Sequence, residues 1–114
     1  MSLSQKKCVH CERGTQPLSG REIDDRLQEC SGWELSKDGR AIVRKIKFGD
    51  FKEALSFVNR VGEVAEQENH HPDICFGWGY CEIELQTHAI GGLHENDFVM
   101  AAKINDIVRE PAHA

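Results

Sequence analysis

Hydrophobic residues recur along the chain with a helical period in three segments. In residues 20–29, Ile23 and Leu27 lie four positions apart among charged residues, which predicts a short amphipathic helix. A longer stripe predicts a helix over residues 51–68, formed by Phe51, Ala54, Leu55, Val58, Val61 and Ala65. A third stripe predicts a helix over about residues 94–109, formed by Met100, Ala101, Ile104, Ile107 and Val108.

Between the first two helices, the hydrophobic residues alternate with polar ones at a period of two. Residues 33–48 contain the dipeptide Asp38-Gly39, which is typical of a tight turn between two strands. The hydrophobic side chains on either side of this dipeptide share one face, and Arg44 is the one polar residue expected to point inward with them. The segment therefore predicts a β-hairpin.

A second alternating segment lies between the long helix and the last one. Residues 74–78 and 80–88 predict a hairpin that turns near Gly79, with Thr87 on the core side of its second strand and His88 on the opposite side. The chain thus reads helix, hairpin, helix, hairpin, helix. This order predicts an α+β fold, a two-layer sandwich in which helices pack on one face of a four-stranded antiparallel sheet.

Length and charge narrow the function classes. The 114 residues suffice for one domain, which we expect at residues 19–114 behind a flexible, dispensable N-terminal arm at residues 1–18. The 14 basic and 19 acidic residues give a formal charge of −5, so no nucleic-acid partner is expected.

No apolar stretch approaches the roughly 20 residues that span a bilayer, so we expect a cytoplasmic protein without membrane contact. Exposed sheet edges predict a homodimer or homotetramer.

The cysteines do not form a recognisable disulfide framework. Five are present, an odd number that favours free thiols in a reducing compartment. Only Cys8-Val-His-Cys11 has the spacing of metal ligands, and with His10 it still provides fewer than the four ligands of a structural zinc site. We expect no metal there, although a site completed by a second subunit is the alternative.

Two adjacent histidines followed by a proline suggest acid/base chemistry. Proline excludes the residue before it from the helical conformation, so the long helix must end by His70, and His71-Pro72 must begin a loop. Glu66 lies one turn before His70, within reach of that loop. Imidazole exchanges protons near neutral pH, and an adjacent carboxylate fixes its tautomer and raises its basicity. Such a group can catalyse an elimination without a metal.

Taken together, these residues resemble the pterin-4a-carbinolamine dehydratase family. The family pattern is a Glu four residues before His-His-Pro, a later aromatic residue, a Thr-His pair, and an Asp nine residues beyond that His. In this sequence the pattern comprises Glu66, His70, His71, Pro72, Trp78, Thr87, His88 and Asp97. The resemblance extends over about residues 32–108. Two departures from it are Ile74, where animal members have an aromatic residue, and His94, where a Ser or Thr helix cap is usual.

The resemblance implies a function and a role for each motif residue. Family members remove water from a 4a-hydroxytetrahydropterin to give the quinonoid dihydropterin, which recycles the pterin of aromatic amino acid hydroxylases. No metal or organic cofactor is required. The catalytic residues would be His70, His71 and His88. The residues that bind or orient the substrate would be Glu66, Pro72, Trp78, Thr87 and Asp97.

Two other classes of function remain open at this stage. The same histidines and carboxylates are normal zinc ligands, which allows a metal-dependent hydrolase. Some family members also act as dimerisation partners, and members related to assembly factors are degenerate at the site, which allows a non-catalytic interaction protein. The complete set of motif residues favours the enzyme.

Overall fold

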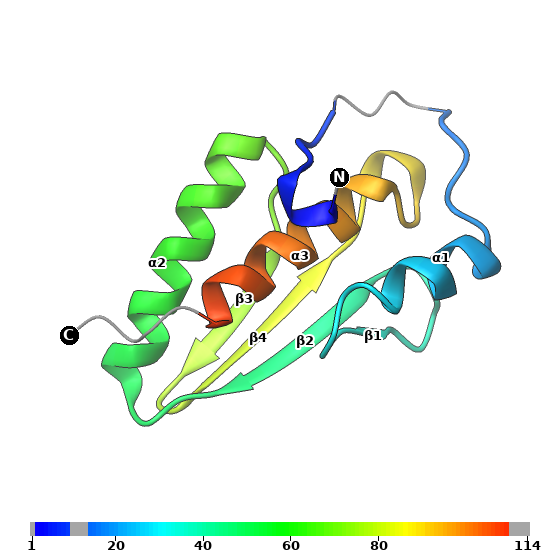
Figure 1. Ribbon diagram of the computed structural model, residues 1–114. Helices are drawn as coiled ribbons and strands as arrows, with labels where there is room; N and C mark the ends of the chain where they lie inside the picture. The colour runs from blue at the N-terminus through cyan, green and yellow to red at the C-terminus, as the bar shows by residue number, and fades with distance from the viewer. Residues whose placement is uncertain (1, 10–13, 110–114) are drawn as a thin grey trace.

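The computed structural model describes residues 2–9 and 14–109, and the predicted α+β architecture is confirmed (Figure 1). The strands form one antiparallel sheet in the order β1-β2-β4-β3, with the helices packed on one of its faces. The described elements, in chain order, are η1 (Leu3–Gln5), α1 (Gly20–Leu27), β1 (Glu34–Leu35), β2 (Ile42–Lys47), α2 (Phe51–Glu68), β3 (Asp73–Gly77), β4 (Tyr80–Leu85), η2 (His88–Ile90) and α3 (Glu95–Arg109).

Both predicted hairpins form, and glycines with positive φ make their turns. Gly39 has a φ of 73° in the β1–β2 connection, and Gly79 has a φ of 84° in the two-residue turn between β3 and β4. Side chains other than glycine rarely adopt this backbone region. The alternation along β4 is as predicted, because Cys81, Ile83 and Leu85 are buried against the helices.

The last strand is shorter than the sequence predicted. β4 ends at Leu85, and Thr87 forms an isolated bridge with Gly92 instead of continuing the ladder. The N–H of Thr87 donates to the carbonyl of Gly92 at 2.9 Å, so the chain doubles back over the short helix η2, which begins at His88. His88 is nevertheless exposed and Thr87 is buried, as the alternation predicted.

Helix α2 has the predicted limits but a different buried stripe. The Asp50 carboxylate accepts the N–H of Glu53 at 2.9 Å and caps the helix. The buried residues are Ala54, Phe57, Val61 and Ala65. Phe51 and Leu55, which we expected in the stripe, are exposed, because the buried face has Phe57 at one edge and these two residues lie beyond its opposite edge.

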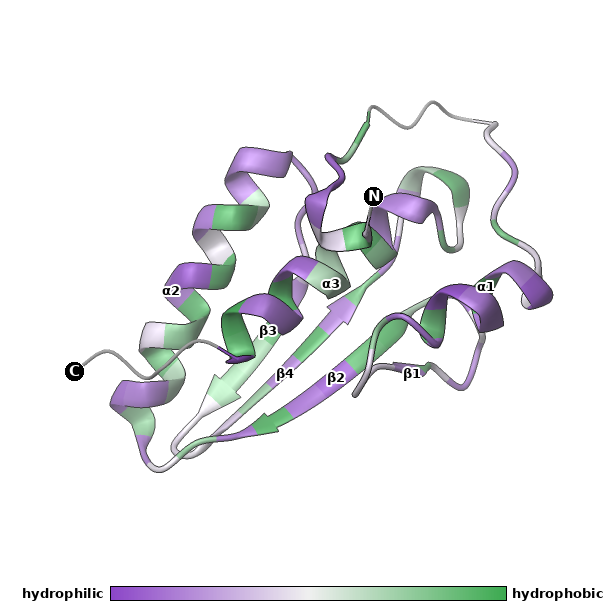
Figure 2. Ribbon diagram, in the orientation of Figure 1, coloured by the Kyte–Doolittle hydropathy of each residue, from purple (hydrophilic) through white to green (hydrophobic). Residues whose placement is uncertain are grey.

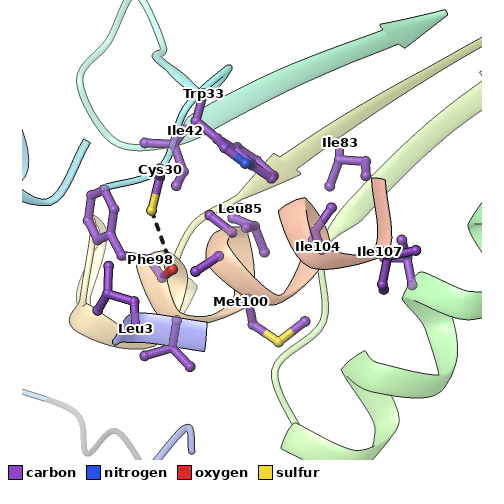
Figure 3. Close-up of a cluster of buried hydrophobic side chains, with 14 of the residues drawn as sticks. Leu3, Cys30, Trp33, Ile42, Ile83, Leu85, Phe98, Met100, Ile104 and Ile107 are labelled. Atoms are coloured by element: carbon purple, nitrogen blue, oxygen red, sulfur yellow. Dashed lines mark hydrogen bonds between the residues drawn. The ribbon is translucent and has the colours of Figure 1, made fainter. Parts of the chain in front are cut away.

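Helix α3 lies across the middle of the sheet and supplies much of the core (Figures 1 and 3). The helix contains polar as well as apolar residues (Figure 2). Three of the polar residues, Asn96, Asp97 and Asn105, are buried together with the apolar ones. Asn105 accepts hydrogen bonds from the Trp33 indole at 2.9 Å and from the inward-pointing guanidinium of Arg44. Arg44 is therefore accommodated in the helix layer by polar partners, and burial lowers its pKa, with Arg109 adding to the effect.

Residues 2–9 contact the core, which the sequence did not predict. Leu3 is only 5% exposed and belongs to the core cluster drawn in Figure 3. The Lys103 ammonium donates to the carbonyl of Ser4 at 2.8 Å, which ties the segment to α3. The sequence contained no sign of this contact because a single buried leucine produces no periodic pattern. His10 and Cys11 lie outside the described residues.

Candidate active site

The two adjacent histidines lie where the sequence placed them, directly after α2. Asn69 ends the helix in the left-handed conformation, with a φ of 51°, and its N–H donates to the carbonyl of Ala65. The N–H of His70 donates to the same carbonyl at 3.2 Å. Pro72 then leads into β3. The helix end therefore directs His70 and His71 out of the helix together.

His70 is bonded to a fully buried carboxylate. Its Nε2 lies 2.7 Å from Oδ1 of Asp97, and the exposed fractions of the two side chains are 13% and 0%. The second carboxylate oxygen accepts the Thr87 hydroxyl at 2.8 Å and the N–H of His94 at 3.0 Å. Since an ionised carboxylate only accepts hydrogen bonds, the neutral His70 ring carries its proton on Nε2 in this arrangement.

The other two histidines are open to solvent, and each also faces a carboxylate. Nε2 of His71 is hydrogen-bonded to Oε2 of Glu66 across one turn of chain. Nε2 of His88 lies 3.9 Å from Oδ2 of Asp73, while its Nδ1 accepts from the Gln86 amide at 2.9 Å. The side chains of His71 and His88 are 54% and 70% exposed. All three motif histidines thus have an acidic neighbour, hydrogen-bonded to His70 and His71 and 3.9 Å from His88, and two of the histidines are accessible to a ligand.

Two residues of this arrangement were missed in the sequence. Asp73 faces His88 only because the start of β3 lies beside the end of β4, a tertiary contact that no local pattern predicts. His94 caps α3 in place of the usual Ser or Thr, since its Nδ1 accepts the N–H of Asn96 at 3.0 Å. The N–H of His94 donates in turn to Asp97, so these two side chains both accept backbone N–H groups at the start of α3. The sequence signal for this cap was the position of His94 three residues before Asp97, the spacing of a helix start.

Trp78 is the motif residue that the structure does not bring to the others within one chain. It occupies the β3–β4 turn and is 72% exposed. Pro72 lies at the opposite end of β3, six residues away, which corresponds to roughly 20 Å along an extended strand. Trp78 therefore cannot wall a substrate held by the histidines of its own chain.

The described residues give no support to a metal centre. Within residues 2–9 and 14–109, no three His, Cys, Asp or Glu side chains are grouped so that they could hold a metal ion. The described cysteines are free thiols. In the same part of the chain, no helix has the length and apolar character required to cross a membrane.

Comparison with known proteins agrees with the motif and the geometry. Residues 16–107 match the family model described as pterin 4 alpha carbinolamine dehydratase. A relative from Halorhodospira halophila named for pterin-4-alpha-carbinolamine dehydratase is 52% identical over 105 residues, covering 92% of this chain and 96% of its own.

Two solved structures share the fold. One is titled transcriptional coactivator/pterin dehydratase from Brucella melitensis, with a TM-score of 0.77, 33% identity, and coverage of 81% of this chain and 98% of that chain. The other is titled a pterin dehydratase-like protein that is a RuBisCO assembly factor in the alpha-carboxysome. It has a TM-score of 0.60 and 21% identity over 70% of this chain and 93% of its own, a similarity that concerns the fold alone. The family model and the relatives together show that this chain belongs to the pterin 4 alpha carbinolamine dehydratase family.

Proposed function

We propose that this protein is a hydro-lyase that dehydrates 4a-hydroxytetrahydropterin to the quinonoid dihydropterin, in the recycling of the pterin used by aromatic amino acid hydroxylases. The observation that carries the proposal is the pairing of three histidines with three carboxylates at one end of the sheet. The complete motif and the family membership support it.

The reaction requires two proton transfers on a single substrate. The C4a–O bond breaks as the leaving hydroxyl takes up a proton and departs as water. The N5 proton is removed, and the electron pair of the N5–H bond forms the C4a–N5 double bond. An acid and a base must therefore flank the ring, and each contributes on the order of 10²–10⁴-fold to the rate.

The exposed histidines are best placed to perform these transfers. His71 and His88 present accessible imidazoles, whereas His70 is largely buried and held by Asp97. Glu66 is hydrogen-bonded to His71 and fixes its tautomer, and both Glu66 and Asp73 are close enough to stabilise the imidazolium form of their histidine after proton uptake. In this scheme His70 is the third catalytic imidazole, held in one tautomer by Asp97, and Asp97 and Thr87 orient it at the polar edge of the pterin site. Which imidazole protonates the hydroxyl is left open.

The proposal includes a setting for the enzyme. It uses neither a metal nor an organic cofactor, and it acts in the cytoplasm without binding nucleic acid or membrane. It associates as a homodimer or homotetramer, because β1 and β3 are edge strands whose free backbone groups favour pairing with another chain. Trp78, at the end of edge strand β3, lies where a second subunit is best able to use it.

Substitution of the exposed histidines tests the function. His71→Ala and His88→Ala should each lower the dehydration rate on the order of 10²-fold or more while leaving the fold intact, because both side chains are solvent-exposed. Gln67→Ala, an exposed neighbour on α2, is the matched control and should keep the wild-type rate. Wild-type rates in both histidine variants would exclude the assignment, and a folded wild-type protein without activity would favour an interaction role.

A further inference from the structure

The N-terminal residues 2–9, which we call the N-terminal strap, lie outside the part of the chain that matches the family model. The strap begins in the core, where Leu3 is buried and η1 packs against α3 (Figures 1 and 3). From there it runs toward the end of the sheet that carries the histidines (Figure 1).

At its far end, the strap makes four hydrogen bonds to α2 and α3. The N–H of Cys8 donates to Oε1 of Glu68 at 2.7 Å. The Asn96 side chain bonds to both backbone groups of Val9, accepting its N–H at 2.9 Å and donating to its carbonyl at 2.6 Å. The Cys8 thiol donates to the carbonyl of Asn96 at 3.6 Å. Asn96 is only 4% exposed, so its side-chain amide depends on these partners.

The two anchor residues flank the buried pair of the active site. Glu68 is the last residue of α2, two positions before His70, and Asn96 immediately precedes Asp97 in α3. The strap therefore joins the two chain segments whose side chains meet in the His70–Asp97 hydrogen bond. That bond spans the end of one helix and the start of another, and a small displacement of either would lengthen it.

We propose that the N-terminal strap positions His70 against Asp97, with Glu68 and Asn96 as positioning residues. The part of this proposal that concerns catalysis depends on the proposed dehydratase function, whereas the part that concerns the His70–Asp97 geometry does not. The strap also stabilises the negative charge of Glu68. This carboxylate lies at the C-terminal end of α2, where the helix dipole is unfavourable for an anion, and it accepts the backbone N–H of Cys8 there.

The Cys8 thiol has a structural part in this arrangement. Burial, with the nearby charge of Glu68 as the next largest cause, raises its pKa to about 12. At neutral pH it is therefore a protonated donor to Asn96 and not a thiolate, the form in which cysteine binds zinc. The strap is held by hydrogen bonds and by Leu3.

Substitutions at Glu68 test the proposal without disturbing the core. Glu68→Ala removes the acceptor for Cys8, Glu68→Gln keeps a carbonyl oxygen there, and Glu63→Ala, on an exposed position of the same helix, is the matched control for lost charge. Deletion of residues 2–9 is a more severe variant that also removes Leu3 from the core. The point variants therefore carry the test if the deleted protein does not fold.

Two readouts distinguish positioning from general stability. In ¹⁵N NMR, His70 should show a proton fixed on Nε2 in wild type, Glu68→Gln and Glu63→Ala, and tautomer averaging in Glu68→Ala. In kinetics, Glu68→Ala should lower kcat roughly 10- to 100-fold with little change in KM, and Glu68→Gln should restore it. Behaviour of Glu68→Ala identical to that of Glu63→Ala in the NMR spectrum would overturn the proposal. If the wild type shows no dehydratase activity, the proposed function fails, while the NMR comparison still decides the role of the strap.

Discussion

The Asp97→Asn substitution separates the structural from the catalytic part of the buried pair. The Asp97 carboxylate accepts three hydrogen bonds, from His70, Thr87 and the N–H of His94. An amide of the same shape has one acceptor oxygen, and the backbone N–H of His94 requires it because a backbone N–H cannot become an acceptor. The amide NH₂ then faces Nε2 of His70, which must accept and move its proton to Nδ1.

The expected magnitudes follow from this exchange. The charge-assisted bond is replaced by a neutral one, so the free energy of unfolding should fall by only about 1 kcal/mol, and Tm by about 4 °C. The forced tautomer should lower kcat on the order of 10²- to 10⁴-fold. Asp97→Ala, by contrast, leaves buried polar groups unpaired and should cost about 3 kcal/mol.

Thermal unfolding followed by circular dichroism and dehydration followed by absorbance measure the two effects separately. ¹⁵N NMR of His70 reports the tautomer directly. A wild-type rate in a folded Asp97→Asn protein, with His70 protonated on Nδ1, would show that the proton on Nε2 has no part in catalysis. A loss of stability as large as that of Asp97→Ala would show that the amide does not take over the hydrogen bonds of the carboxylate.

Three further predictions concern residues outside the buried pair. Glu66→Gln should lower kcat about tenfold with unchanged Tm, because it weakens the orientation of His71 at an exposed site; an unchanged rate would remove Glu66 from the mechanism. His94→Ala should lower the free energy of unfolding by about 1 kcal/mol in urea titrations, and His94→Ser should recover most of that loss; equal stabilities would argue against the cap. Iodoacetamide at pH 8 should modify the exposed Cys75 and leave Cys30, whose thiol pKa burial raises to about 11, unmodified in peptide mapping; equal labelling would contradict that burial.

The sequence predicted those features that depend on local spacing. The limits of α2, the turn at Gly79 and the exposure of His88 follow from a cap, a glycine and an alternation within a few residues. Local patterns do not determine which neighbouring segment covers a side chain. Phe57 was missed on α2 for this reason, because it lies on the opposite edge of the apolar stripe from Phe51 and Leu55, and the spacing alone does not show which edge the core covers.

In the site, too, local spacing predicted some features and tertiary contacts determined the others. The motif identified His70, His71, His88 and Asp97 as a group, and the structure shows that each histidine has its own carboxylate. The partner of His88 is Asp73, which reaches it only through the pairing of β3 with β4. The contacts of the N-terminal strap were not predicted, because hydrogen bonds between a backbone segment and side chains distant in sequence have no sequence signature. The distance from Trp78 to the histidines likewise required the strand arrangement.

The central claim is that the histidine–carboxylate pairs dehydrate a 4a-hydroxypterin without a metal. The most direct measurement is the rate at which chemically generated 4a-hydroxytetrahydropterin is converted to the quinonoid dihydropterin, followed by absorbance, with purified protein in the presence and absence of a chelator. We predict a rate that rises in proportion to protein concentration and is the same with and without the chelator. A rate equal to that of the buffer control, or an acceleration that the chelator abolishes, would contradict the claim.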